Sequence, residues 1–126
     1  MARMEPSASP LVAIVDDDDL FRRSIERLVR AAGFRVESFG SAEEFLERGS
    51  LDRTACAILD MKLPGMNGLD LQQRLVTTSR PMPIVFVSAH DEAVMRANAF
   101  KAGAIAFLKK PFDNITLLNA LQRALK

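Results

Sequence analysis

The chain has 126 residues, with 17 Lys and Arg against 16 Asp and Glu, and a formal net charge of +1. Hydrophobic residues make up 48% and charged residues 26%, which excludes a wholly disordered chain. The balanced charge argues against direct nucleic-acid binding, and no apolar run reaches the roughly 18 residues of a membrane span. The length fits one domain with one buried core.

The ends and the cysteine content indicate where the domain begins and in which compartment it works. The single cysteine, Cys56, cannot form an internal disulfide, so we expect a reduced, cytoplasmic setting with this residue in the core. The N-terminus lacks the apolar segment of a secretory signal. We expect a flexible lead-in over residues 1–9 and one folded domain over residues 10–126.

Two kinds of segment alternate along the chain. Short apolar or alternating runs predict strands at residues 11–15, 34–38, 55–59, 84–87 and 105–108. Apolar residues at helical spacing, often ended by glycine, predict helices at 21–32, 41–49, 69–78, 91–102 and 114–125. This alternation predicts an α/β fold, a doubly wound parallel sheet of five strands with helices on both faces.

Charged and hydroxyl side chains follow four of the predicted strands. Asp16 and Asp17 come after the first strand, Asp60 after the third, Ser88 after the fourth and Lys110 shortly after the fifth. Ligands of open parallel sheets bind beyond the carboxyl ends of the strands, so these groups share the expected ligand edge. Converging carboxylates need a cation, and all-oxygen ligation suits Mg²⁺. A lysine and a hydroxyl beside them suggest a phosphoryl group next to the metal.

Simpler interpretations exist for each residue taken alone. A run of acids often begins a helix, where the dipole favours negative charge, and we assign Asp18 and Asp19 to that purpose. Asp60 alone could be a loop acid, Ser88 a turn former and Lys110 a surface charge. Their occurrence at separate strand ends on one edge favours a functional site.

The same residues carry a resemblance to a known family. The chain from Leu11 to Leu125 resembles the receiver domain of two-component response regulators, and Ser88-Ala89-His90 indicates the FixJ and NarL class. The motifs that carry the resemblance are Val15-Asp16-Asp17-Asp18, Leu59-Asp60-Met61-Lys62-Leu63-Pro64-Gly65-Met66-Asn67-Gly68, Val87-Ser88-Ala89 and Phe107-Leu108-Lys109-Lys110-Pro111-Phe112. The resemblance implies a flavodoxin-like sheet with strand order 2-1-3-4-5.

The resemblance also implies roles at the acidic edge. Asp60 is similar to the phosphoacceptor, which takes a phosphoryl group from a histidine kinase. Asp17 is similar to the main Mg²⁺ ligand, and Asp16 holds either a metal-bound water or the ion itself. Asp60 and the backbone carbonyl of Lys62 complete the implied metal ligands. The implied activity is limited to the domain's own phosphorylation and dephosphorylation, so the chain is not expected to be an enzyme.

Further implied residues act on the phosphoryl group and transmit its presence. Ser88 donates a hydrogen bond to a phosphoryl oxygen and Lys110 forms an ion pair with another, with a cis peptide before Pro111. Phe107 is similar to the aromatic switch and is expected to rotate inward after phosphorylation. His90, the only histidine, is expected to influence water access and phosphate lifetime.

Partner surfaces follow from the same resemblance. Exposed residues of the first helix, Leu20 and Ser24, are expected to contact the cognate histidine kinase, whereas Phe21 is expected in the core. A phosphorylation-favoured homodimer is expected on the surface of the fourth helix, last strand and last helix. The expected contact patch is Val94, Ala97, Lys101 and Ile105. DNA would be reached only through an output domain absent from this chain, and no membrane contact is expected.

Three other functions share part of this residue pattern. A Mg²⁺-dependent phosphohydrolase could use Asp60 as nucleophile, but the common haloacid-dehalogenase pattern needs a second Asp where Lys62 stands. A nucleotide-binding domain lacks its glycine-rich loop. An unphosphorylated pseudo-receiver would serve as a scaffold, and the intact set of Asp60, Ser88 and Lys110 disfavours it.

Overall fold

A computed structural model describes residues 9–77, 82–90 and 92–125. The strands are β1 (Leu11–Val15), β2 (Arg35–Phe39), β3 (Thr54–Asp60), β4 (Ile84–Ser88) and β5 (Ala106–Lys109). The helices are α1 (Asp19–Ala31), α2 (Ala42–Arg48), α3 (Gly68–Val76), α4 (Ala93–Lys101) and α5 (Asn114–Ala124). Within the described residues, no helix combines the length and apolar character needed to cross a bilayer.

The five strands form one parallel sheet in the order β2-β1-β3-β4-β5, which confirms the predicted architecture. The bounds of β1 are as predicted, and the ends of the other strands differ from the prediction by at most one residue. The main difference is that Asp60 and Ser88 are the last residues of their strands, whereas they were predicted to follow them. Pairing with neighbouring strands continues through both residues, so ladder hydrogen bonds fix the backbone of each.

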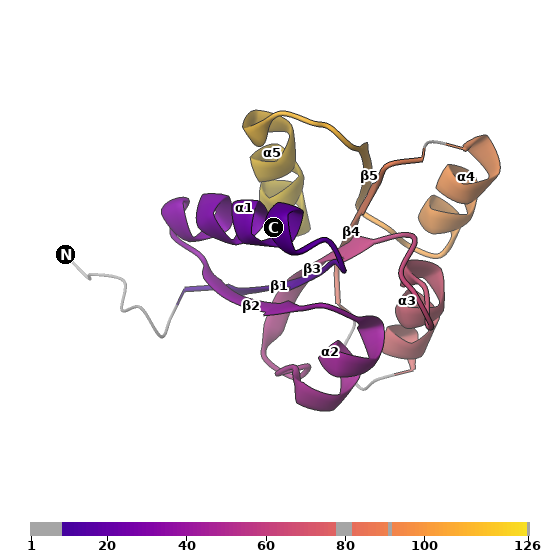
Figure 1. The fold of residues 1–126 in the computed structure, drawn as a ribbon, viewed down its shortest axis with the longest axis horizontal. Coiled ribbons are helices and arrows are strands. Elements are labelled where there is room, and N and C mark those ends of the chain that lie inside the picture. The colour runs from indigo at the N-terminus through magenta and orange to yellow at the C-terminus, as the bar shows by residue number, and fades with distance from the viewer. Residues whose placement is uncertain (1–8, 78–81, 91, 126) are drawn as a thin grey trace.

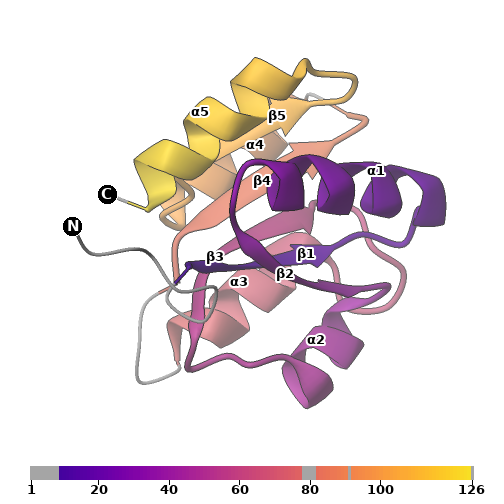
Figure 2. The same cartoon turned by 90° about the vertical axis from the view of Figure 1, so that its left-hand side faces the viewer.

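Helices cover both faces of the sheet (Figure 1). Alternating residues of each strand point to opposite faces, and the core is therefore divided into two clusters. One includes Ala13, Leu59 and Phe86 and packs against α2, α3 and α4. The other includes Ile14 and Ile58 and packs against α1 and α5, which lie next to each other in Figure 2. Burial on both faces explains why the central strands are almost continuously apolar.

Side chains at the N-termini of four helices fix where those helices begin. Ser41 caps α2 by accepting a hydrogen bond from the backbone N–H of Glu44 at 3.1 Å, as its spacing predicts. Asp18 caps α1 in the same way, which confirms its predicted structural role. Asn67 and Asp113 cap α3 and α5, and neither cap was predicted.

Two predictions concern residues at the edge of what the structure describes. The lead-in prediction falls on residues 1–8, which lie outside the described residues, and Asp91, the predicted start of the fourth helix, lies outside them too. Ser9 is described, and its carbonyl accepts a hydrogen bond from Arg35 at 2.8 Å. Cys56 is completely buried, as predicted, and burial raises the pKa of its thiol to about 12.

Candidate functional site

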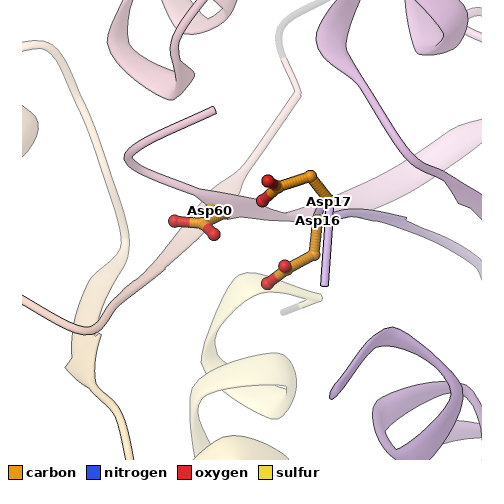
Figure 3. Close-up of side chains that lie close together, drawn as sticks. All are labelled: Asp16, Asp17 and Asp60. Carbon is orange, nitrogen blue, oxygen red and sulfur yellow. The ribbon is translucent and has the colours of Figure 1, made fainter. Parts of the chain in front are cut away.

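Three carboxylates meet at the carboxyl edge of the sheet. Asp16 and Asp17 follow β1, and Asp60 ends the neighbouring strand β3, so pairing of the two strands places the acids together. Each offers an oxygen within 4.8 Å of the others. Figure 3 shows the three side chains pointing toward a common space. The predicted convergence of these acids is therefore present in the structure.

Lys110 supplies the positive charge in this cluster. Its ammonium donates a hydrogen bond to Asp16 Oδ2 at 2.9 Å and a longer one to Asp60 Oδ2 at 3.4 Å. The Asp16 side chain is 1% exposed and that of Lys110 17%, so water screens this ion pair little. The Lys110–Pro111 peptide bond is cis, as the resemblance implied.

The surroundings shift the acid–base properties of two of these groups. Burial is the main cause that raises the pKa of the Asp60 carboxyl, and the nearby charge of Asp16 adds to it. The backbone N–H of Lys62 and the ammonium of Lys110 act in the opposite direction without cancelling the increase. Burial also disfavours the Lys110 ammonium, but its hydrogen bond to Asp16 and the charges of Asp60 and Asp16 outweigh burial and raise the pKa of Lys110.

The donor set fits a hard divalent cation. Three carboxylates and one ammonium leave a formal charge of −2 at the site. Asp17 is exposed, and within the described part of the chain its carboxylate has neither a hydrogen-bond nor an ion-pair partner. An unpartnered acid beside two buried ones supplies the oxygen ligands and the charge that Mg²⁺ prefers.

The loop after β3 is held from two sides. The backbone N–H of Lys62 donates to Asp60 Oδ1 at 3.0 Å and so fixes the orientation of that carboxylate. From the first turn of α2, Glu43 accepts a hydrogen bond from the backbone N–H of Met66 at 2.9 Å, and this bond lowers the pKa of Glu43. The side chain of Lys62 is exposed and forms a long ion pair with Glu92 at 3.8 Å.

Ser88 lies on β4, which pairs with β3, and Phe107 lies on β5, the edge strand beyond β4. Ser88 is buried at the end of β4, and its hydroxyl accepts a hydrogen bond from the backbone N–H of His90 at 3.0 Å. Phe107 is 3% exposed and belongs to the core, with the guanidinium of Arg96 5.4 Å from its ring centre. The ring of Phe107 is therefore already inward in this structure, and the expected rotation from an outward to an inward position does not apply to it.

The predicted partner residues are exposed with one exception. On α1, Leu20 is 79% exposed and Ser24 is also exposed. On α4, the three predicted residues Val94, Ala97 and Lys101 are all exposed. Ile105 is half-buried and packs against the cluster that α1 and α5 cover, so most of its side chain is unavailable to a partner.

Two features near the site were not predicted from the sequence. Phe21, assigned to the core, is only half-buried, and its ring lies against the ammonium of Lys110. The helical periodicity of α1 indicated the inward face correctly but could not reveal this neighbour. Gly68 begins α3 so close to β3 that an added Cβ would lie 2.4 Å from the carbonyl oxygen of Asp60. A glycine at the start of a helix was the one available indication.

Comparison with known proteins agrees with this geometry. The family model of the response regulator receiver domain matches residues 12–122. The chain belongs to this family. It is therefore a receiver domain of the two-component response regulators, a signalling domain, and the resemblance noted in the sequence is confirmed.

Individual relatives support the assignment. Nodulation protein W of Bradyrhizobium diazoefficiens is 42% identical over 95% of this chain and 53% of its own length. Response regulator protein TmoT of Ectopseudomonas mendocina is also 42% identical, over 92% of this chain and 53% of its own length. The receiver chain thus spans about half the length of these curated relatives.

Solved structures show the same fold. Response regulator StyR matches with a TM-score of 0.86 and 46% identity, over 94% of this chain and 60% of the StyR chain. The FixJ-N structure matches with a TM-score of 0.84 and 31% identity, over 97% of this chain and 95% of its own. Chemotaxis protein CheY4 of Vibrio cholerae has a TM-score of 0.86 at 28% identity, over 94% of this chain and all of its own.

Proposed function

We propose that this receiver domain is switched by phosphorylation of Asp60 in a Mg²⁺-dependent reaction. The observation that carries the proposal is the position of the Asp60 carboxylate, which faces Asp16 and Asp17 on one side and the Lys110 ammonium on another. One anionic nucleophile, two further acids and one fixed cation are the groups that phosphoryl transfer to a carboxylate requires.

The transfer itself needs no general base. An oxygen of Asp60 forms a bond to the phosphorus of a kinase phosphohistidine, the P–N bond breaks, and its electron pair leaves with the imidazole. The backbone N–H of Lys62 holds Oδ1, and Oδ2, which lies 3.4 Å from the Lys110 ammonium, is the oxygen that attacks. Burial, which raises the pKa of Asp60, also leaves its anion poorly solvated and therefore more nucleophilic.

Positive charge is the remaining requirement of a loose, in-line transition state. When bound by Asp16, Asp17, Asp60 and the backbone carbonyl of Lys62, Mg²⁺ supplies charge neutralisation for the phosphoryl oxygens. Before the transfer, Lys110 forms an ion pair with the Asp60 carboxylate. After it, the same ammonium pairs with an oxygen of the phosphoryl group on Asp60. Lys110 therefore neutralises negative charge on both the unphosphorylated and the phosphorylated side chain.

The switch follows from the charge added at the strand ends. A phosphoryl group adds roughly −1.5 to −2 charges. Ser88 would turn its hydroxyl toward the new group and give up its hydrogen bond with His90. Phe107 would then repack and alter the α4–β5–α5 surface, where the exposed residues Val94, Ala97 and Lys101 offer contacts for a phosphorylation-favoured homodimer.

The wider setting is proposed from the relatives. Receiver domains interact with histidine kinases, and we place the cognate kinase against Leu20 and Ser24 of α1. One relative is named transcriptional regulatory protein TdiR, and this chain spans 50% of its length. We propose a cytoplasmic protein in which a separate output domain contacts DNA.

Incubation with acetyl phosphate and Mg²⁺ tests this proposal. Intact mass should rise by one phosphoryl group in the wild type, and the increase should be absent from Asp60→Asn and when EDTA removes the metal. A matched control is Asp70→Asn, which changes an exposed acid on α3 and should label normally. Full labelling of the Asp60 variant would exclude Asp60 as the acceptor, whereas continuous phosphate release without labelling would favour a phosphohydrolase.

A further inference from the structure

The ammonium of Lys110 is held by an aromatic ring as well as by carboxylates. Its Nζ lies 4.1 Å from the ring centre of Phe21, within the range of a cation–π interaction. The same nitrogen donates to Asp16 and Asp60 at 2.9 and 3.4 Å. The Lys110 side chain is 17% exposed, so the ring and the acids together shield it from most of the solvent.

Phe21 connects two parts of the chain that the sheet itself keeps apart. It lies in the first turn of α1, whereas Lys110 follows β5, and β3 and β4 separate β1 from β5. Phe112, in the loop before α5, meets the Phe21 ring edge-on, with centroids 5.9 Å apart and an interplanar angle of 89°. Figure 2 shows α1 and α5 on the same side of the sheet. The two rings thus fasten the loop that carries Lys110 to α1.

The physical character of this contact suits a group that must change partners. A ring face attracts a cation through its quadrupole and offers no lone pair that would fix an N–H donor of the ammonium. The contact is therefore compatible with hydrogen bonds to Asp16 and Asp60 and equally with bonds to a phosphoryl oxygen. An acidic neighbour in the same place would instead compete with the phosphoryl group for the ammonium.

We infer that Phe21 is a positioning residue for phosphoryl transfer, acting through a cation–π contact with Lys110. The inference rests on the proposed function, because it assigns Phe21 to the same reaction at Asp60. The inference assigns to Phe21 more than the apolar contact area that a half-buried residue of α1 contributes. It assigns to the π face of the ring the attraction that holds the Lys110 ammonium in place.

Three variants separate the ring face from apolar packing. Phe21→Leu keeps an apolar side chain but removes the π face, and Phe21→Tyr keeps the aromatic ring. Phe34→Leu is the matched control, because Phe34 is also half-buried and packs against the same core cluster as Phe21. The measurement is the rate constant for labelling of Asp60 by saturating acetyl phosphate and Mg²⁺, with the urea midpoint of each variant recorded beside it.

Phe21→Leu should lower the rate constant by about 3- to 10-fold, the range expected for loss of one cation–π contact. Phe21→Tyr should stay close to the wild type, and Phe34→Leu should lower the urea midpoint without lowering the rate constant. In a Lys110→Gln background, Phe21→Leu should cause no further loss, because the ammonium it acts on is gone. Equal losses in both backgrounds, or equal rate losses in the two Phe→Leu variants, would overturn the inference.

An NMR measurement that does not depend on phosphorylation tests the contact between Phe21 and Lys110 itself. Ring current from Phe21 should move the NMR signals of the Lys110 Cε protons upfield in the wild type and in Phe21→Tyr, but not in Phe21→Leu. Wild-type protein that shows the upfield signals but is not labelled at Asp60 would overturn the proposed function while leaving the contact in place. Labelled wild-type protein without upfield signals would overturn the role of Phe21 alone.

Discussion

Lys110 Nζ and Asp16 Oδ2 lie 2.9 Å apart, although the two residues are separated by 94 positions in the sequence. The pair spans the carboxyl edge of the sheet from β1 to the loop after β5, with the Asp60 carboxylate as a second acceptor. Both carboxylates are buried, and the ammonium compensates only one of the negative charges that the fold concentrates there. Predictions about charge, metal and folding follow from this arrangement.

Lys110→Gln should have opposite effects on metal binding and on reaction. Removing the Lys110 ammonium from beside the three carboxylates should increase the affinity for Mg²⁺ by about 3- to 10-fold, because the lysine charge no longer repels the metal ion. The labelling rate should nevertheless fall by about 100-fold, since the transition state loses a fixed positive charge. Lys109→Gln removes the same charge from the exposed neighbouring residue and is the matched control. Unchanged labelling by acetyl phosphate in Lys110→Gln would contradict this account.

Asp17→Asn should weaken Mg²⁺ binding by about tenfold or more, because the site loses its one exposed, unpartnered carboxylate. Titration of Mg²⁺ followed by calorimetry or by thermal stabilisation measures the change. Asp18→Asn is a sharp control: it removes the same charge one residue away, and Asn replaces Asp well at an N-cap. Equal affinities in the wild type and Asp17→Asn would remove Asp17 from the metal site.

Without divalent metal, the charge on Asp60 should destabilise the fold. Its pKa is raised in the folded chain above the ordinary value of 3.8, chiefly by burial. The folded state therefore holds the proton more tightly than the unfolded state, and this stability is lost as pH rises from about 3.8 through the raised pKa. At pH 7 in EDTA, Asp60→Asn should be more stable than the wild type by a free energy of unfolding on the order of 1 kcal/mol.

Urea unfolding at several pH values measures that difference. It should be largest near neutral pH and should shrink as the pH falls toward 3.8, because the wild-type carboxyl then becomes neutral like the amide. Saturating Mg²⁺ should also reduce it, since the metal stabilises the wild-type site. A wild type that remains the more stable protein at pH 7 in EDTA would show that Lys110 fully compensates Asp60.

Gly68→Ala should disturb the end of β3. An added Cβ would lie 2.4 Å from the Asp60 carbonyl oxygen and 2.9 Å from the Met61 Cα, so strand and helix would have to separate. We expect the free energy of unfolding to fall by about 1–3 kcal/mol, as in overpacked cores, together with slower labelling of Asp60. Gly40→Ala, whose Cβ would make only an ordinary contact at 3.7 Å, should leave both measurements almost unchanged. Equal effects of the two substitutions would contradict the close approach of Gly68.

The sequence was informative wherever a local pattern determines the structure. Buried strands such as Ala57 to Leu59 are continuously apolar because helices cover both faces, and the alternation of such runs with helical patterns indicates the sheet class. The position of Asp60 next to Asp16 also followed, because the carboxyl ends of parallel strands share one edge. Strand ends were less certain, since pairing with the neighbouring strand, and not residue type, extends β3 through Asp60.

Contacts between distant segments could not be predicted in this way. The ring of Phe21 meets Lys110 only after α1 and α5 have packed on the same face of the sheet. The hydrogen bond from the Met66 backbone to Glu43 likewise depends on how α2 approaches the loop after β3. Helical periodicity in the sequence indicates which side of a helix faces inward, but it does not indicate which residues of other elements those side chains contact.

The position of the acquired phosphoryl group tests the central claim most directly. After labelling with acetyl phosphate and Mg²⁺, borohydride should reduce an aspartyl phosphate to a homoserine residue, a change that phosphate esters of Ser and Thr do not undergo. Peptide mass spectrometry should then find homoserine at position 60 in the wild type. Homoserine at any other position, or phosphate retained on a hydroxyl residue after reduction, would contradict the assignment of Asp60 as the phosphoacceptor.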